Sequence, residues 1–122
     1  ETEKVKWNVS DGHFNYLGPK TNPFPYIKNS DILVSTSYSE ACPFVVNEAL
    51  ALGVPVVSNN YPSIYEFICD GENGRICALD EMSTVLVNLI KNKSQLDKLK
   101  NNVMRRADTN ETIINKIENL FV

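Results

Sequence analysis

The chain has few of the residues that metal sites and disulfide frameworks need. It contains one histidine, His13, and three cysteines, Cys42, Cys69 and Cys77, at irregular spacing. An odd number of cysteines without regular spacing argues against a disulfide framework and is typical of a reducing cytosol. No Cys/His pattern with metal-ligand spacing is present in the sequence, so we expect no bound metal.

Long hydrophobic runs and clusters of positive charge are also absent from the sequence. No apolar run approaches the roughly 20 residues of a membrane-spanning helix, and no secretory signal pattern begins the chain. The net charge is −3 and no basic run occurs before residue 90, which argues against nucleic-acid binding through phosphate neutralisation. Segment 91–106 is richer in Lys and Arg, but acids and amides intersperse it. We interpret it as a solvated helix face; the alternative is contact with an anionic membrane or substrate.

The composition that remains is that of one globular domain. Its 122 residues, 43% apolar and 22% charged, can bury a single hydrophobic core. We therefore interpret residues 1–122 as one domain. The chain begins Glu1-Thr2-Glu3 without a methionine, so we expect it to be a piece of a longer protein.

Short apolar runs alternate with helical patterns along the first two thirds of the chain. Such alternation predicts βαβ units and a parallel sheet with right-handed crossovers. The expected strands are His13–Leu17, Asp31–Thr36, Pro55–Ser58 and Arg75–Cys77. The expected helices between them are Tyr26–Asn29, Pro43–Leu52 and Ser63–Cys69, with Ser63 as a cap.

Helical patterns without strands occupy the last third of the chain. The predicted fold class is therefore α/β, a Rossmann-like parallel sheet flanked by helices with a C-terminal helical run. Parallel strands usually need cover on both faces, so we expect the start of a larger doubly wound domain to lie upstream. The candidate N-caps of the three last helices are Asp80, Ser94, and Thr109 or Asn110.

Segment 37–55 carries the residues with the clearest chemistry. It is predicted to be a strand end, a tight turn and an almost wholly apolar helix beginning at Pro43. The backbone N–H groups of Phe44 and Val45 have no partner inside the helix, and the helix dipole adds partial positive charge there. These donors suit a diphosphate; the alternative is that water or the Ser39 hydroxyl satisfies them.

Two glutamates flank the start of this helix. Glu48 lies about four residues into the helix, roughly 6–7 Å along the axis from its amino end. Its two carboxylate oxygens match two vicinal ribose hydroxyls; the alternative is a polar stripe of Asn47 and Glu48 that faces solvent. Glu40 precedes the helix, where it could hold sugar hydroxyls or stabilise positive charge on a sugar ring. The alternative for Glu40 is an ordinary surface turn residue.

The run from Glu40 to Glu48 has the E-x7-E spacing found in retaining GT-B glycosyltransferases, and its surroundings resemble the family-4 group of those enzymes. E-x7-E alone is a weak signal, whereas four features in the same order are specific. The resemblance covers roughly residues 14–121. The matching features are Tyr16-Leu17-Gly18, the runs 22–32 and 48–57, and Asp70-Gly71-Glu72-Asn73-Gly74.

This resemblance implies the donor-binding half of a two-domain enzyme, the C-terminal domain of a GT-B fold with the N-terminal acceptor domain absent. It implies that Glu48 binds the donor ribose and that Glu40, the catalytic candidate, contacts the transferred sugar. The other implied donor-binding residues are Ala41, Cys42 and Pro43 along the sugar, Phe44 and Val45 at the diphosphate, and Gly18 and Lys20 near the base.

The implied reaction moves a hexose from a UDP- or GDP-sugar to a glycan or lipid-linked acceptor, with retention at the anomeric carbon. The leaving diphosphate would be stabilised electrostatically, without metal or cofactor. We expect a cytoplasmic protein of surface polysaccharide synthesis, at the inner face of the membrane when full length, and an inactive fragment by itself. The alternatives are a non-catalytic GT-B-like interaction subunit and a relative of sugar-nucleotide epimerases.

The sequence departs from the family pattern in three places. Ala41-Cys42 follow the first glutamate, where Gly-Phe is often found, which is expected to reshape the sugar pocket. Pro62-Ser63 replace a Gly-Gly pair before the later glutamate, Glu66, so this loop should be stiffer. The Arg and Lys that hold the leaving diphosphate in the family cannot be assigned to Lys4 or Lys6.

Overall fold

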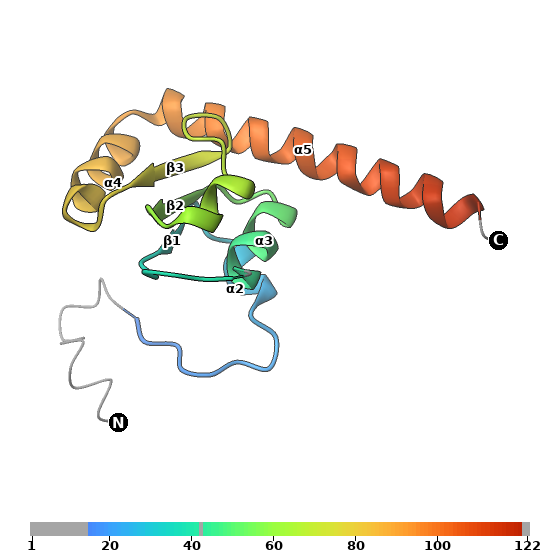
Figure 1. Ribbon diagram of the computed structural model, residues 1–122, viewed down its shortest axis with the longest axis horizontal. Coiled ribbons are helices and arrows are strands. Elements are labelled where there is room, and N and C mark those ends of the chain that lie inside the picture. Colours follow the sequence, from blue (N-terminus) through green and yellow to red (C-terminus); the bar gives the residue numbers. More distant parts are fainter. Residues whose placement is uncertain (1–14, 42, 121–122) are drawn as a thin grey trace.

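The computed structural model describes residues 15–41 and 43–120, with side chains up to residue 106. Within this part the chain forms one parallel sheet flanked by helices (Figure 1). The strands are β1 (Leu33–Ser35), β2 (Val56–Asn59) and β3 (Gly74–Cys77), in the order β1-β2-β3. The predicted α/β class with a Rossmann-like parallel sheet is confirmed.

The register of the sheet brings the segments after β1 and β2 to one edge. Val57 of β2 lies between Val34 of β1 and Arg75 of β3. Because the strands are parallel, their carboxyl ends share an edge, which is where α/β proteins bind ligands. The loop after β1 and the loop after β2 therefore meet there.

Alternate residues of β2 build a separate hydrophobic core on each face of the sheet. Val56 packs with Val46 and Ala49 of helix α3 (Phe44–Ala51). On the other face Val57 packs with Leu89 of helix α4 (Met82–Lys91). All four residues of β2 are buried, as expected for a short, continuous apolar strand covered on both faces.

The residues at the two ends of helix α3 explain where it begins and where it stops. Pro43, which was predicted as the first helical residue, is its N-cap, so the helix begins one residue later, at Phe44. Beyond the C-cap Leu52, Gly53 adopts φ +84°, a left-handed conformation that glycine tolerates best. The N–H of Gly53 bonds the carbonyl of Leu50 at 3.2 Å, and the N–H of Val54 bonds that of Ala49 at 2.9 Å. This Schellman pattern stops the helix at the predicted place.

Two short helices differ from the prediction at both of their ends. Helix α2 spans Phe24–Lys28 and begins two residues before the predicted Tyr26. The predicted helix after β2 is a 3₁₀ helix, η1 (Pro62–Glu66), whose N-cap is Tyr61 rather than Ser63. Another 3₁₀ helix, η2, precedes α4 and spans Leu79–Glu81.

The caps predicted for the later helices are wrong. Asp80 lies inside η2, and the N-cap of α4 is Glu81 without a side-chain bond. The side-chain oxygen of Asn92 accepts the N–H of Gln95 at 3.4 Å and the hydroxyl of Ser94 at 2.8 Å, so Asn92 takes the capping role predicted for Ser94. In these cases the turn geometry before the helix decides which side chain reaches the free N–H groups.

The predicted strand His13–Leu17 is wrong in the part that the structure describes. Residues 15–17 belong to no strand, and Tyr16 and Leu17 are exposed. His13 lies outside the described residues. A short run of strand-forming residues needs a neighbouring strand and a packed face, and this one gains neither a ladder nor a buried face.

A single helix replaces the last two predicted helices. Helix α5 runs from Lys93 to Leu120 without a break at Thr109 or Asn110. No glycine or proline occurs between residues 93 and 120, so nothing in that segment forces the helix to end. Figure 1 shows α5 passing from α4 toward α3 and continuing beyond the sheet. No described helix is both long and apolar enough to span a bilayer.

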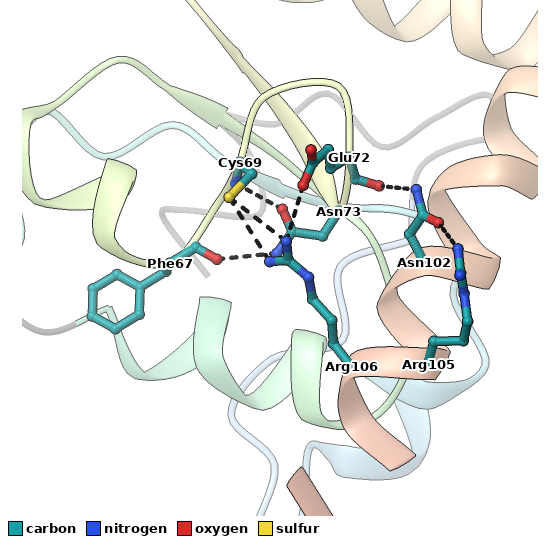
Figure 2. Close-up of polar contacts among 7 residues, drawn as sticks. All are labelled: Phe67, Cys69, Glu72, Asn73, Asn102, Arg105 and Arg106. Atoms are coloured by element: carbon teal, nitrogen blue, oxygen red, sulfur yellow. Dashed lines mark hydrogen bonds and ion pairs between the residues drawn. The ribbon is translucent and has the colours of Figure 1, made fainter. Parts of the chain in front are cut away.

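Polar contacts fasten the middle of α5 to the turn before β3 (Figure 2). The Arg106 guanidinium pairs with Glu72 at 3.0 Å, and the Asn102 amide donates to the Glu72 carbonyl at 2.9 Å. Inside the turn, Asn73 donates to the Phe67 carbonyl at 3.1 Å and accepts the N–H of Cys69 at 2.8 Å. Arg106 and Glu72 are both well exposed, so their ion pair contributes at most about 1 kcal/mol.

Candidate functional site

The start of α3 lies at the carboxyl edge of the sheet and has no side-chain cap in the described chain. Its first internal bond joins the N–H of Asn47 to the carbonyl of Pro43 at 3.1 Å. The N–H groups of Phe44 and Val45 precede this bond, and both residues are exposed. Ser39, the alternative partner considered for these donors, does not cap the helix. The arrangement offers two N–H groups and a positive helix end to an anion.

Glu48 lies one turn into α3, between the buried residues Val46 and Ala49. Its side chain is half-buried, as is that of Asn47. Among the described residues no cation or hydrogen-bond donor is paired with the Glu48 carboxylate. A half-buried carboxylate without a partner in the protein can accept hydrogen bonds from the hydroxyls of a ligand.

The loop between β1 and α3 is held by hydrogen bonds around Glu40. The Ser37 hydroxyl donates to Glu40 Oε1 at 3.0 Å, and the Ser63 hydroxyl donates to the Glu40 carbonyl. The Asn59 amide, at the end of β2, donates to the Ser37 carbonyl at 3.0 Å. Glu40 is half-buried, and both its carboxylate and its carbonyl accept hydrogen bonds.

Tyr61 lies beneath this loop and is only 1% exposed. Its hydroxyl is buried and has no hydrogen-bond partner among the described residues. Burial raises the pKa of the Tyr61 phenol above its ordinary value of 10.0. The side chains of Ser58 and Ser35 lie near enough to donate hydrogen bonds to a phenolate and so oppose this shift, although neither bonds the neutral hydroxyl, and the negative charge of Glu40 adds to it.

The remaining predicted site residues lie apart from the two glutamates or along the loop before α3. Gly18 has φ +69°, as a glycine turn requires, and the Lys20 ammonium lies 5.6 Å from the centre of the Tyr26 ring, a cation–π distance. No described contact joins Lys20 to Glu40 or to Glu48. Of the three residues expected along the sugar, Ala41 is exposed, Pro43 is buried, and Cys42 lies outside the described residues.

Two cavities lie away from these residues. One of about 250 Å³ is bounded by α3, the end of η1 and α5, and one of about 90 Å³ lies between the β3 turn and the start of α5. None of the predicted donor residues lines either cavity. In the part of the chain that the structure describes, no three or more His, Cys, Asp or Glu residues gather as metal ligands would.

Sequence reasoning missed the residues that hold the Glu40 loop. Ser37 follows β1, and Asn59 is the last residue of β2. Polar residues at the carboxyl ends of parallel strands often belong to a ligand site, and this was the signal that could have found them. Ser63 was identified as a helix cap and as part of a stiffer loop, but not as a partner of Glu40. Its actual partner is distant in the sequence and becomes a neighbour only when the sheet forms.

Comparisons with known proteins identify the family of this chain. Residues 9–108 match the family described as glycosyl transferases group 1. A protein of Haemophilus influenzae, named an uncharacterized glycosyltransferase, is 37% identical to this chain over 79 residues. That match covers 61% of this chain and 22% of the Haemophilus protein, so the chain spans less than a quarter of that relative's length. Because the family match includes the whole sheet, α3 and both glutamates, the chain belongs to the group 1 glycosyl transferases.

Proposed function

We propose that this chain is the donor-binding portion of a retaining, family-4 type GT-B glycosyltransferase whose acceptor domain lies upstream. Its donor is a UDP- or GDP-hexose, and its acceptor is a glycan or lipid-linked sugar in surface polysaccharide synthesis. The observation that carries the proposal is the uncapped start of α3 between the Glu40 loop and Glu48. Membership of a glycosyl transferase family supports sugar transfer in general.

In this proposal the first turn of α3 binds the diphosphate of the donor. The N–H groups of Phe44 and Val45 donate to phosphate oxygens, and the helix dipole favours their negative charge. Negative charge grows on the diphosphate as the bond to the sugar breaks. Donors fixed in place before the reaction stabilise that charge without reorganisation, which lowers the barrier.

The two glutamates bind the ligand on either side of the diphosphate. Glu48 accepts hydrogen bonds from the ribose hydroxyls, and Glu40 contacts the transferred sugar and stabilises positive charge on its ring. Residues 41–43 line the sugar, while Gly18 and Lys20 lie toward the base. In this scheme no metal takes part, and the start of α3 stabilises the negative charge of the diphosphate.

The longer protein would act in the cytoplasm, at the inner face of the membrane where lipid-linked acceptors are found. The chain alone would bind the donor but transfer nothing, because the acceptor side is supplied by the upstream domain. These assignments follow from the resemblance to the family.

A ligand titration of the 122-residue chain tests the proposal. UDP, GDP and their glucose or mannose conjugates are added, and the amide signals of Phe44 and Val45 are followed by NMR. We expect saturable shifts at millimolar ligand. Glu48→Gln should weaken binding about 10- to 100-fold, as expected for the loss of hydrogen bonds to a charged group.

Glu81→Gln is the matched control, because Glu81 is exposed at the start of α4, away from the site. It should leave every affinity unchanged. If a folded chain with a dispersed spectrum shows no saturable change with either nucleotide, the proposed function is wrong. If Glu48→Gln binds as the wild type does, the assignment of the ribose contact is wrong.

A further inference from the structure

We infer that Ser63, acting with Ser37 and Asn59, is a positioning residue that holds Glu40 in place for the donor sugar. This inference rests on the proposed function, in which Glu40 contacts the transferred sugar. Ser63 itself touches no ligand in this scheme and acts only through Glu40.

The position of Ser63 is fixed by its neighbours in η1. Tyr61 before it is 1% exposed and Ile64 after it is fully buried, so both are anchored in the core. Pro62 between them restricts the backbone further, because its ring fixes φ. The Ser63 hydroxyl is therefore carried on a rigid segment, and it donates to the carbonyl of Glu40 across the edge of the sheet.

A second connection holds the other end of the same loop. Asn59 is the last residue of β2 and is 7% exposed, and its amide donates to the Ser37 carbonyl at 3.0 Å. The Ser37 hydroxyl in turn donates to Oε1 of Glu40 at 3.0 Å. The segment 59–63 thus supports both the backbone and the carboxylate of Glu40.

The two connections leave one oxygen of the carboxylate available. Among the described residues, Glu40 Oε1 is held by Ser37 while Oε2 has no hydrogen-bond partner. An ionised carboxylate accepts at both oxygens, so Oε2 can receive a sugar hydroxyl or face a positive ring carbon. A glycine at position 63 would have no hydroxyl, and the Glu40 carbonyl would lose this donor.

Comparing the affinities for a nucleotide and for its sugar conjugate distinguishes a role of Ser63 in positioning Glu40 from a role in stabilising the fold. The quantity compared is the ratio of the Kd for UDP to the Kd for UDP-glucose, or of GDP to GDP-mannose, by calorimetry on the full chain. Ser63→Ala should lower this ratio about three- to tenfold, the worth of one hydrogen bond, and leave the Kd of the bare nucleotide unchanged. Ser63→Thr keeps a hydroxyl and should restore the ratio.

A double-mutant cycle adds a readout that a loss of packing would not mimic. If Ser63 acts through Glu40, Ser63→Ala in a Glu40→Gln background should lower the ratio no further. Ser83→Ala, an exposed serine on α4, is the matched control and should change neither Kd.

The outcomes are distinguishable. A wild-type ratio that Ser63→Ala leaves unchanged overturns the inference, as does equal weakening of both ligands or additivity with Glu40→Gln. Failure of the folded wild-type chain to bind any nucleotide refutes the proposed function itself, and this inference with it.

Discussion

Replacing Tyr61 by phenylalanine should make the chain more stable. The Tyr61 ring is 1% exposed within the core, and its hydroxyl is buried without a partner among the described residues. A buried hydroxyl left without a partner costs about 1–3 kcal/mol. Phenylalanine keeps the ring and removes the hydroxyl, so we expect the free energy of unfolding to rise by about 1 kcal/mol. For a domain of this size, Tm should rise by about 3–5 °C.

Urea unfolding followed by circular dichroism measures this change. Tyr65→Phe is the matched control, because Tyr65 is 56% exposed and its hydroxyl donates to Asn60 at 3.0 Å. The control should shift the free energy of unfolding by no more than about 0.5 kcal/mol. If Tyr61→Phe instead loses about 1 kcal/mol or more, its hydroxyl is bonded in the folded chain, and the reasoning is refuted.

The buried Tyr61 hydroxyl also predicts how the free energy of unfolding depends on pH. Burial raises the pKa of Tyr61 in the folded chain, so the folded state holds this proton more tightly than the unfolded state does. The stabilisation that this proton gives to the folded chain is fully present below pH 10.0, the ordinary pKa of tyrosine. It is lost as pH rises through the higher pKa that Tyr61 has in the folded chain. From about pH 9 to about pH 11 the wild type should therefore lose more stability than Tyr61→Phe. Equal losses would contradict this.

Three further substitutions test the packing and the surface. Gly74→Ala would place a Cβ against the Val56 carbonyl of the neighbouring strand. We expect the free energy of unfolding, measured by thermal unfolding, to fall by about 3 kcal/mol or more. Gly71→Ala, whose Cβ would meet nothing within 4 Å, should lose only the smaller cost of its φ of +87°, and equal losses would contradict this account. The exposed pair between Lys100 and Asp31, 2.6 Å apart, lowers the pKa of Asp31 through its hydrogen bond and charge. Lys100→Ala should therefore cost at most about 0.5 kcal/mol near pH 7. This difference should shrink as pH falls below the ordinary Asp pKa of 3.8 and vanish once pH is below the lower pKa that Asp31 has in the folded chain, and a difference that persists there would argue against the pair.

Several elements could be predicted from the sequence because their signals are local. A continuous apolar run between turn residues predicted β2, and burial on both faces requires such a run. Pro43 and Gly53 marked the two ends of α3, because proline and glycine restrict the backbone wherever they occur. The glutamates at 40 and 48 were found by their spacing around that helix, and their assigned roles stay predictions.

Other features depended on contacts that local preferences do not contain. The strand expected at His13–Leu17 failed where it is described, because strand-forming residues without a pairing partner gain no ladder. The break expected near Asn110 is absent from α5, because a residue suited to capping does not end a helix that can continue.

The sequence alone therefore determined the alternation of strands and helices, the start of α3 and the two acidic positions beside it. The tertiary structure alone decided which groups surround Glu40. Ser63 was predicted as a cap from its local preference, yet its hydroxyl bonds the Glu40 carbonyl, and Asn59 reaches Ser37 in the same way. The physical reason is that a parallel sheet gathers the carboxyl ends of separate strands at one edge, where residues far apart in the chain become hydrogen-bond partners.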